Sequence, residues 1–122
     1  MAEERPPPQQ IQAYGGGAFR VSGERFEGSV LIYADRTAAW SASSIDDISA
    51  AMLTALVAEA PPGVLVIIGC GRSFQPMPAG LRQELAAAGV HAEWMDTGAA
   101  CRTFNVLVSE GREVRAALLA VE

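Results

Sequence analysis

Apolar and polar residues alternate along residues 11–43, a period typical of β-strands with one buried face. Three successive glycines at 15–17 divide the first part of this region, and glycine readily adopts the positive φ that a turn or bulge requires. The pattern therefore predicts an N-terminal hairpin region around these glycines. A second hairpin is predicted with arms at 29–33 and 38–41.

The period changes to that of a helix after Ser44, which suits an N-cap, with Asp47 placed to reach back to it. Apolar residues then recur at helical spacing until Pro61 and Pro62 end the pattern. These signals predict one helix between Ser44 and Pro61. Its apolar stripe consists of Ile45, Ile48, Met52, Ala55 and Leu56.

Five branched apolar residues at 64–68 predict a strand buried on both faces of a sheet. A helix is predicted from Pro78 to Gly89, a strand at 91–95, a helix from Asp96 or Thr97 to about Ser109, and a last strand at 113–121.

The order of these elements predicts an α/β fold. The strand–helix–strand unit at 64–95 requires parallel pairing, so we expect a three-layer domain around a mixed, mostly parallel sheet of about five strands. Residues 10–122 are expected to form this single domain. Residues 1–9 include three successive prolines and are predicted to be a disordered tail.

Composition narrows the function classes. The net charge is −5 and all nine basic residues are arginines, which argues against binding nucleic acid or an anionic membrane. No apolar run reaches the roughly 18 residues needed to span a bilayer, and the acidic, Pro-rich start is unlike a signal peptide. The two cysteines match no zinc spacing. We therefore predict a cytoplasmic protein with reduced thiols, no metal and no cofactor.

A candidate site is predicted at the carboxyl ends of the parallel strands, because ligands of open α/β sheets bind there. The loop after residue 68 can be an anion cradle or merely a tight turn. The thiols can be reactive at a helix N-terminus or simply buried. Asp96 and Thr97 can serve as helix caps, and Asn105 can hold a backbone edge or a ligand. The candidate pocket comprises Gly69, Cys70, Gly71, Arg72, Asp96, Thr97, Cys101, Arg102 and Asn105.

The segment MDTGAACRTFNVL at 95–107, followed by EGR at 110–112, carries a family resemblance, as do YGGGAF at 14–19, GSV at 28–30 and IIGCG at 67–71. Over about residues 10–122 the chain resembles the family of the adipogenesis-associated Mth-type domain protein and of mitochondrial complex I assembly factor 3, long catalogued as a domain of unknown function. Many members carry Gly-Thr-Gly where this chain has Cys70 between two glycines.

This resemblance implies a mixed five-stranded sheet with an antiparallel last strand, and no established enzymatic activity. Eukaryotic relatives assemble respiratory complex I, which implies a protein-binding role. They also carry mitochondrial targeting segments that this sequence does not show, so a bacterial source is expected.

The favoured hypothesis is a non-catalytic protein-interaction module, similar to an assembly factor and linked to respiratory complex assembly. This hypothesis rests on the family resemblance. It rests also on the sequence showing no nucleophile accompanied by a base and an orienting group. The alternative is a small-molecule or anion-binding protein, or a thiol-dependent enzyme, that uses the candidate pocket. A homodimer joined through β-edges is a third hypothesis.

Overall fold

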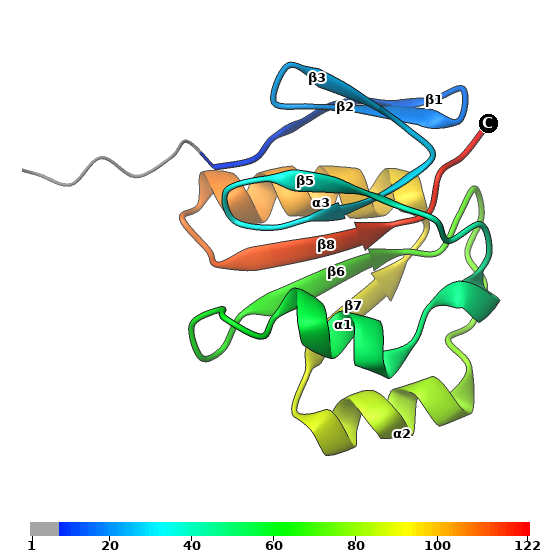
Figure 1. Ribbon diagram of the computed structural model, residues 1–122, viewed down its shortest axis with the longest axis vertical. Helices are drawn as coiled ribbons and strands as arrows, with labels where there is room; N and C mark the ends of the chain where they lie inside the picture. Colours follow the sequence, from blue (N-terminus) through cyan, green and yellow to red (C-terminus); the bar gives the residue numbers. More distant parts are fainter. Residues whose placement is uncertain (1–7) are drawn as a thin grey trace, which may run out of the picture.

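The computed structural model describes residues 8–122, which form two β-sheets and three α-helices (Figure 1). Most of the tail predicted at residues 1–9 lies outside the described residues. The strands are β1 (Ile11–Gly15), β2 (Ala18–Val21), β3 (Glu24–Glu27), β4 (Ser29–Ile32), β5 (Thr37–Trp40), β6 (Leu65–Gly69), β7 (His91–Met95) and β8 (Val114–Leu118). The helices are α1 (Ala50–Leu56), α2 (Ala79–Ala88) and α3 (Thr97–Ser109), with a 3-10 turn, η1 (Ile45–Asp47), before α1.

The larger sheet has the strand order β5-β4-β8-β6-β7, which confirms a mixed sheet of five strands. β6 pairs in parallel with both β7 and β8, whereas β4 is antiparallel to β8 and to β5. The expectation of an antiparallel last strand therefore holds only on the β4 side of β8. On its other side β8 is parallel to β6, because α3 carries the chain back along the sheet between β7 and β8. The last strand is also the middle strand.

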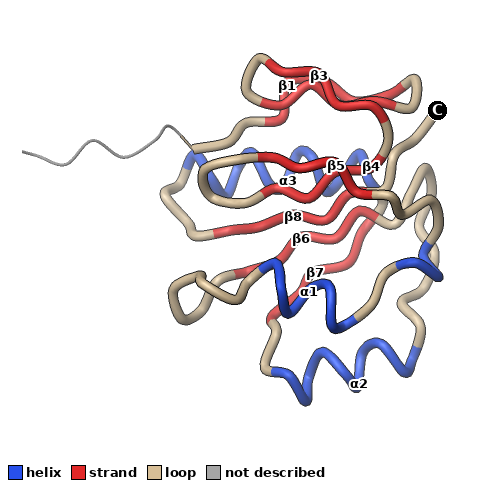
Figure 2. The backbone as a smooth tube through the Cα atoms, in the orientation of Figure 1, coloured by secondary structure: helices blue, strands red, loops and turns tan. Residues whose placement is uncertain are grey.

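The larger sheet lies between two different layers, as Figure 2 shows. Ile67 of β6 packs into a core with α3 and the three-stranded sheet β1-β2-β3. Its neighbours Val66 and Ile68 pack into a second core with α1 and α2. Because successive strand residues point to opposite faces, the apolar run at 64–68 supplies both cores, as the sequence predicted.

The N-terminal hairpin region is a three-stranded antiparallel meander. Its first turn contains Gly16 and Gly17, both at positive φ, and a register shift follows Ile11. The third strand was not predicted. Three of the four residues of β3 are exposed, so its sequence ERFE lacks the alternation that identifies a half-buried strand.

The prediction of one uninterrupted helix after Ser44 is wrong. Asp47 accepts hydrogen bonds from the backbone N–H groups of Ser43 and Ser44, but η1 ends at once. Ile48 is buried with extended backbone, and Ser49 begins α1 by accepting from Met52 N at 3.1 Å. The second cap stops helical hydrogen bonding from continuing across Ile48.

The boundaries of α2 and α3 agree with the predictions, whereas β8 ends at Leu118, before the predicted end at residue 121. Pro78 precedes α2, and Gly89 ends it in the left-handed conformation that favours glycine. Asp96 caps α3, which ends at Ser109. Within residues 8–122, no helix has the length and apolar character to cross a membrane.

Candidate functional site

The loop after β6 and the start of α3 meet at Thr97, which is fully buried. The Thr97 hydroxyl donates to the Leu119 carbonyl at 2.8 Å and accepts from the Gly71 N–H at 3.0 Å. The Thr97 N–H donates in turn to the Gly71 carbonyl at 2.8 Å. The structure thus brings two of the predicted loops together. The Thr97 hydroxyl makes its hydrogen bonds to backbone groups of the protein itself.

Gly69 has no room for a side chain. A Cβ at this position would lie 2.8 Å from Thr97 Oγ1 and 2.9 Å from Thr97 Cα. The glycine therefore allows α3 to approach the end of β6 closely. This packing explains Gly69 without a bound anion.

Cys70 is buried and supports the loop that follows it. Its thiol lies 3.6 Å from the Ser73 carbonyl, to which it donates, and accepts from the Gln75 N–H at 3.4 Å. Trp94 adds a third bond, from its indole N–H to the Gln75 carbonyl, at 2.6 Å. These contacts attach Ser73 and Gln75 of the loop to the end of β6 and to β7.

Cys101 lies in the core between α3 and the two sheets. Loss of hydration on burial raises the pKa of its thiol to about 12, although the neighbouring Arg102 acts in the opposite direction. The thiol is therefore neutral near pH 7, where a nucleophile would have to be ionised. This geometry favours the structural alternative for Cys101.

The first turn of α3 uses Asp96 as its cap, because the carboxylate accepts from Ala99 N at 2.9 Å. No ion pair joins Asp96 to Arg102 among residues 8–122, and Arg102 is exposed. Tyr14 of β1 lies against Gly98, where an added Cβ would be 2.6 Å from the tyrosine hydroxyl. This contact leaves no local pattern in the sequence, since its partners are more than 80 positions apart.

Asn105 holds a backbone edge. Its Oδ1 accepts from Ile11 N at 2.9 Å, and its Nδ2 donates to Ile11 O at 2.7 Å. Both polar atoms of the amide are thus engaged with β1. Of the two alternatives that the sequence left open for Asn105, the structure supports the backbone role.

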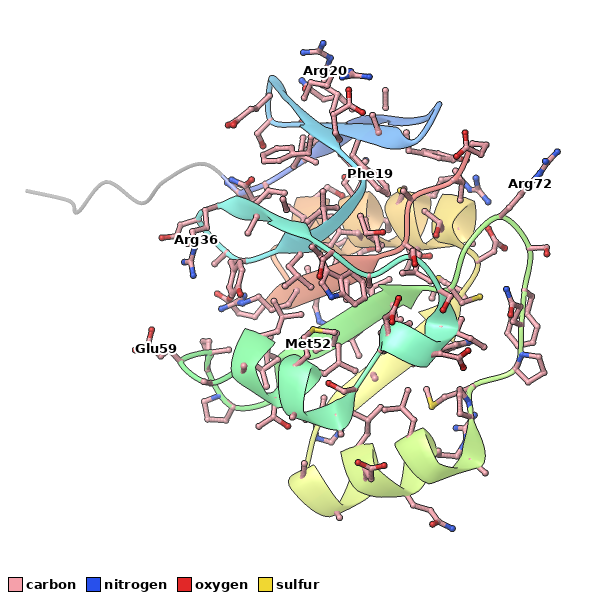
Figure 3. All side chains as sticks on the ribbon, turned by 45° about the vertical axis from the view of Figure 1, so that its right-hand side comes forward. Phe19, Arg20, Arg36, Met52, Glu59 and Arg72 are labelled. Carbon is pink, nitrogen blue, oxygen red and sulfur yellow. The ribbon has the colours of Figure 1, made fainter. Side chains whose placement is uncertain are left out.

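Besides Arg102, three side chains in this region are exposed to solvent. Figure 3 shows Arg72 extending from the loop after β6. Phe74 on the same loop is 62% exposed, and Tyr14 is 42% exposed. Sequence reasoning did not single out Phe74 as a functional residue; an isolated aromatic in a polar loop was the available signal. We call these exposed side chains, together with Arg102, the exposed rim of the candidate region. The polar groups beneath them are hydrogen-bonded within the protein.

The residues described include no group of three histidine, cysteine or acidic side chains arranged for a metal ion. The chemistry of the exposed rim is that of arginine and aromatic side chains. Such groups suit recognition of another molecule better than proton transfer or nucleophilic attack.

Two relatives align with most of the chain. An uncharacterised protein from Rhodobacter capsulatus is 43% identical over 109 residues, which cover 89% of this chain and 82% of that protein. NADH dehydrogenase (ubiquinone) 1 alpha subcomplex assembly factor 3 from Rattus norvegicus is 28% identical over 119 residues, or 98% of this chain. The chain spans only 64% of the length of the rat protein.

A solved structure supports the same relationship. The Mth938-like domain from Bordetella pertussis is 29% identical, with a TM-score of 0.75, and the match covers 98% of this chain and 90% of that one. The family model described as protein of unknown function (DUF498/DUF598) matches residues 11–119. These findings confirm the resemblance inferred from residues 95–112, and the chain belongs to this DUF498/DUF598 family.

Proposed function

We propose that residues 10–122 act as a non-catalytic, protein-binding assembly module that takes part in building bacterial NADH dehydrogenase, the respiratory complex I, from the cytoplasm. The proposal rests first on homology to assembly factor 3. It assigns partner binding to a surface that we call the carboxyl edge. The carboxyl edge consists of Tyr14, Arg72, Phe74 and Arg102.

The observation that carries the proposal is the exposure of Phe74 on a loop that is itself held in place. A phenylalanine that is 62% exposed gains free energy when a partner covers it. Because hydrogen bonds of Cys70 and Trp94 already hold the loop, binding requires little further ordering of its backbone. Aromatic and arginine side chains are also the residues enriched at protein interfaces, and Arg72 stands two positions away.

The four residues share one end of the molecule. The bonds between Gly71 and Thr97 join the Phe74 loop to the start of α3. At Gly98, one residue further on, the side chains of Tyr14 from β1 and of Arg102 from the next turn of α3 lie close together. One partner can therefore contact Arg72 and Phe74 of the loop after β6, Tyr14 of β1 and Arg102 of α3.

Affinity capture of the tagged full-length chain from its own cells tests the proposal. NADH dehydrogenase subunits should copurify with the wild-type chain, and Phe74→Ser should lower their recovery at least tenfold. Val106→Ser is the matched control, because Val106 is 54% exposed on α3 and lies outside the carboxyl edge. Equal recovery with Phe74→Ser, or no NADH dehydrogenase subunit in the wild-type sample, would contradict the proposal.

A further inference from the structure

A groove of about 790 Å³ lies at the end of the larger sheet opposite the carboxyl edge. Figure 1 shows the segments that surround it on the left: the β4–β5 turn, the end of α1 and the start of β8. Figure 3 shows Arg36 and Glu59, two of its lining residues, on the side away from Arg72. The volume is that of a small-molecule site, and none of the nine candidate pocket residues lines it.

Arg115 of β8 lies in this groove, although its side chain is only 9% exposed. Strand alternation directs it to the same face as Ala117, whose core includes α1. Its Nη1 lies 3.4 Å from the Val114 carbonyl, to which it donates, and 3.6 Å from Glu113 Oε2. Both contacts use the same nitrogen.

The other guanidinium nitrogens of Arg115, Nε and Nη2, make no hydrogen bond to the residues described. No fully buried side-chain nitrogen of those residues lacks a partner. Within the part of the chain that the structure describes, the two nitrogens are therefore not fully enclosed, and the groove that Arg115 lines provides access to them. A guanidinium has five N–H donors and can bind a carboxylate through two parallel hydrogen bonds.

Among residues 8–122, the charge of Arg115 is poorly matched. Its contact with Glu113 is 3.6 Å, longer than the roughly 2.8 Å of a strong charge-assisted hydrogen bond, and the Glu113 side chain is 48% exposed. A cation withdrawn from water favours a closely placed anion. Elsewhere in the groove, Asp35 pairs with Arg36 at 3.3 Å, so that pair neutralises itself.

The lining also includes an apolar surface beside the arginine. Ala55, which is exposed, and Leu56 contribute it from α1, which packs on the face of the sheet that Arg115 occupies. The groove is lined by Arg36, Arg112 and Arg115, of which only Arg115 is withdrawn from water. One such buried charge next to apolar surface fits a ligand with one carboxylate and an apolar tail. A dianion fits less well, because Asp35, Glu59 and Glu113 also line the groove.

We propose that this groove binds a small monocarboxylate with an apolar body, whose carboxylate pairs with Arg115 in place of Glu113 and whose tail lies against α1. The proposal does not depend on the protein-binding function of the carboxyl edge. The two can therefore fail separately.

Titration of the full-length chain with sodium octanoate, followed by NMR of the backbone amides, tests the proposal. Octanoate should shift amides of residues 55–60 and 113–115, whereas 1-octanol and octylammonium should bind at least tenfold more weakly. Arg115→Met should weaken octanoate binding at least tenfold, and Arg72→Met, which changes an exposed arginine outside the groove, should not. Glu113→Gln should tighten binding, because it removes the competing carboxylate.

A second pair of variants tests the groove even if Arg115→Met does not fold. Ala55 and Ala51 are both exposed on α1, but only Ala55 lines the groove. Ala55→Trp should fill the groove and abolish the octanoate shifts, while Ala51→Trp should leave them unchanged. Absence of binding to the wild-type chain, equal binding of 1-octanol, or unchanged binding to Ala55→Trp would overturn the proposal.

Discussion

The side-chain amide of Asn105 forms two hydrogen bonds with the backbone of Ile11, at 2.9 and 2.7 Å, although the two residues are 94 positions apart. The amide thereby substitutes for a neighbouring strand at the start of β1. It attaches the three-stranded sheet to α3, whose second turn carries Arg102 of the carboxyl edge. Asn105, for which the sequence left open a backbone contact or a ligand contact, thus connects two layers of the structure.

Replacement of Asn105 by alanine should lower the free energy of unfolding by about 2 kcal/mol, since two partly buried backbone groups of Ile11 lose their partners. Urea denaturation measures this change, and hydrogen exchange at Ile11 should accelerate. Ser109→Ala, on the exposed end of the same helix, is the control and should change stability by less than about 0.5 kcal/mol. An unaltered exchange rate at Ile11 would be evidence against the attachment.

Gly69→Ala should destabilise the protein by about 1–3 kcal/mol, because the new methyl would overlap both side-chain and backbone atoms of Thr97. Gly80→Ala is the matched control. Position 80 lies in α2 with open space around it, so alanine there should stabilise the helix by up to about 1 kcal/mol. The two variants should therefore shift the urea midpoint in opposite directions. A shift in the same direction would contradict the close approach of α3 to β6.

Because of the Cys101 thiol, the free energy of unfolding should fall as the pH rises through the alkaline range. Its pKa is about 12 in the folded protein, above the ordinary value of 9.0, so folding favours the protonated form. The contribution is complete below pH 9 and is lost as pH rises from about 9 to about 12, with a slope of at most about 1.4 kcal/mol per pH unit.

Urea denaturation at pH 8, 10 and 11 measures that slope, and Cys101→Ala should reduce it. Iodoacetamide should also label Cys101 at pH 8 only under unfolding conditions. Rapid labelling of Cys101 in the native chain would show that the thiol is accessible and ionised.

The elements with local signals were predictable from the sequence. Gly89 and Asp96 mark helix ends through their own backbone and side-chain chemistry, so α2 and α3 were placed correctly. The break at Ile48 was not predictable, because the apolar residues on both sides keep a helical period. β3 was missed for the opposite reason, since its residues are mostly exposed.

The proximity of the two candidate loops was predictable from the sequence, whereas the contacts of their side chains were not. Topology brought Gly71 and Thr97 together as expected. The partners that engage Thr97 and Asn105, however, lie 22 and 94 positions away. Neither pairing leaves a local pattern. The same holds for Arg115, which reads as one polar residue in an apolar strand until the groove beside it is known.

The most direct measurement of the central claim is the amount of assembled NADH dehydrogenase, resolved on a native gel, in cells that lack this protein. The account predicts that the complex falls in such cells and is restored by the wild-type chain and by Val106→Ser. Phe74→Ser should accumulate as a folded protein without restoring the complex. Normal assembly in the absence of the protein, or full restoration by Phe74→Ser, would contradict the assignment of an assembly function to the carboxyl edge.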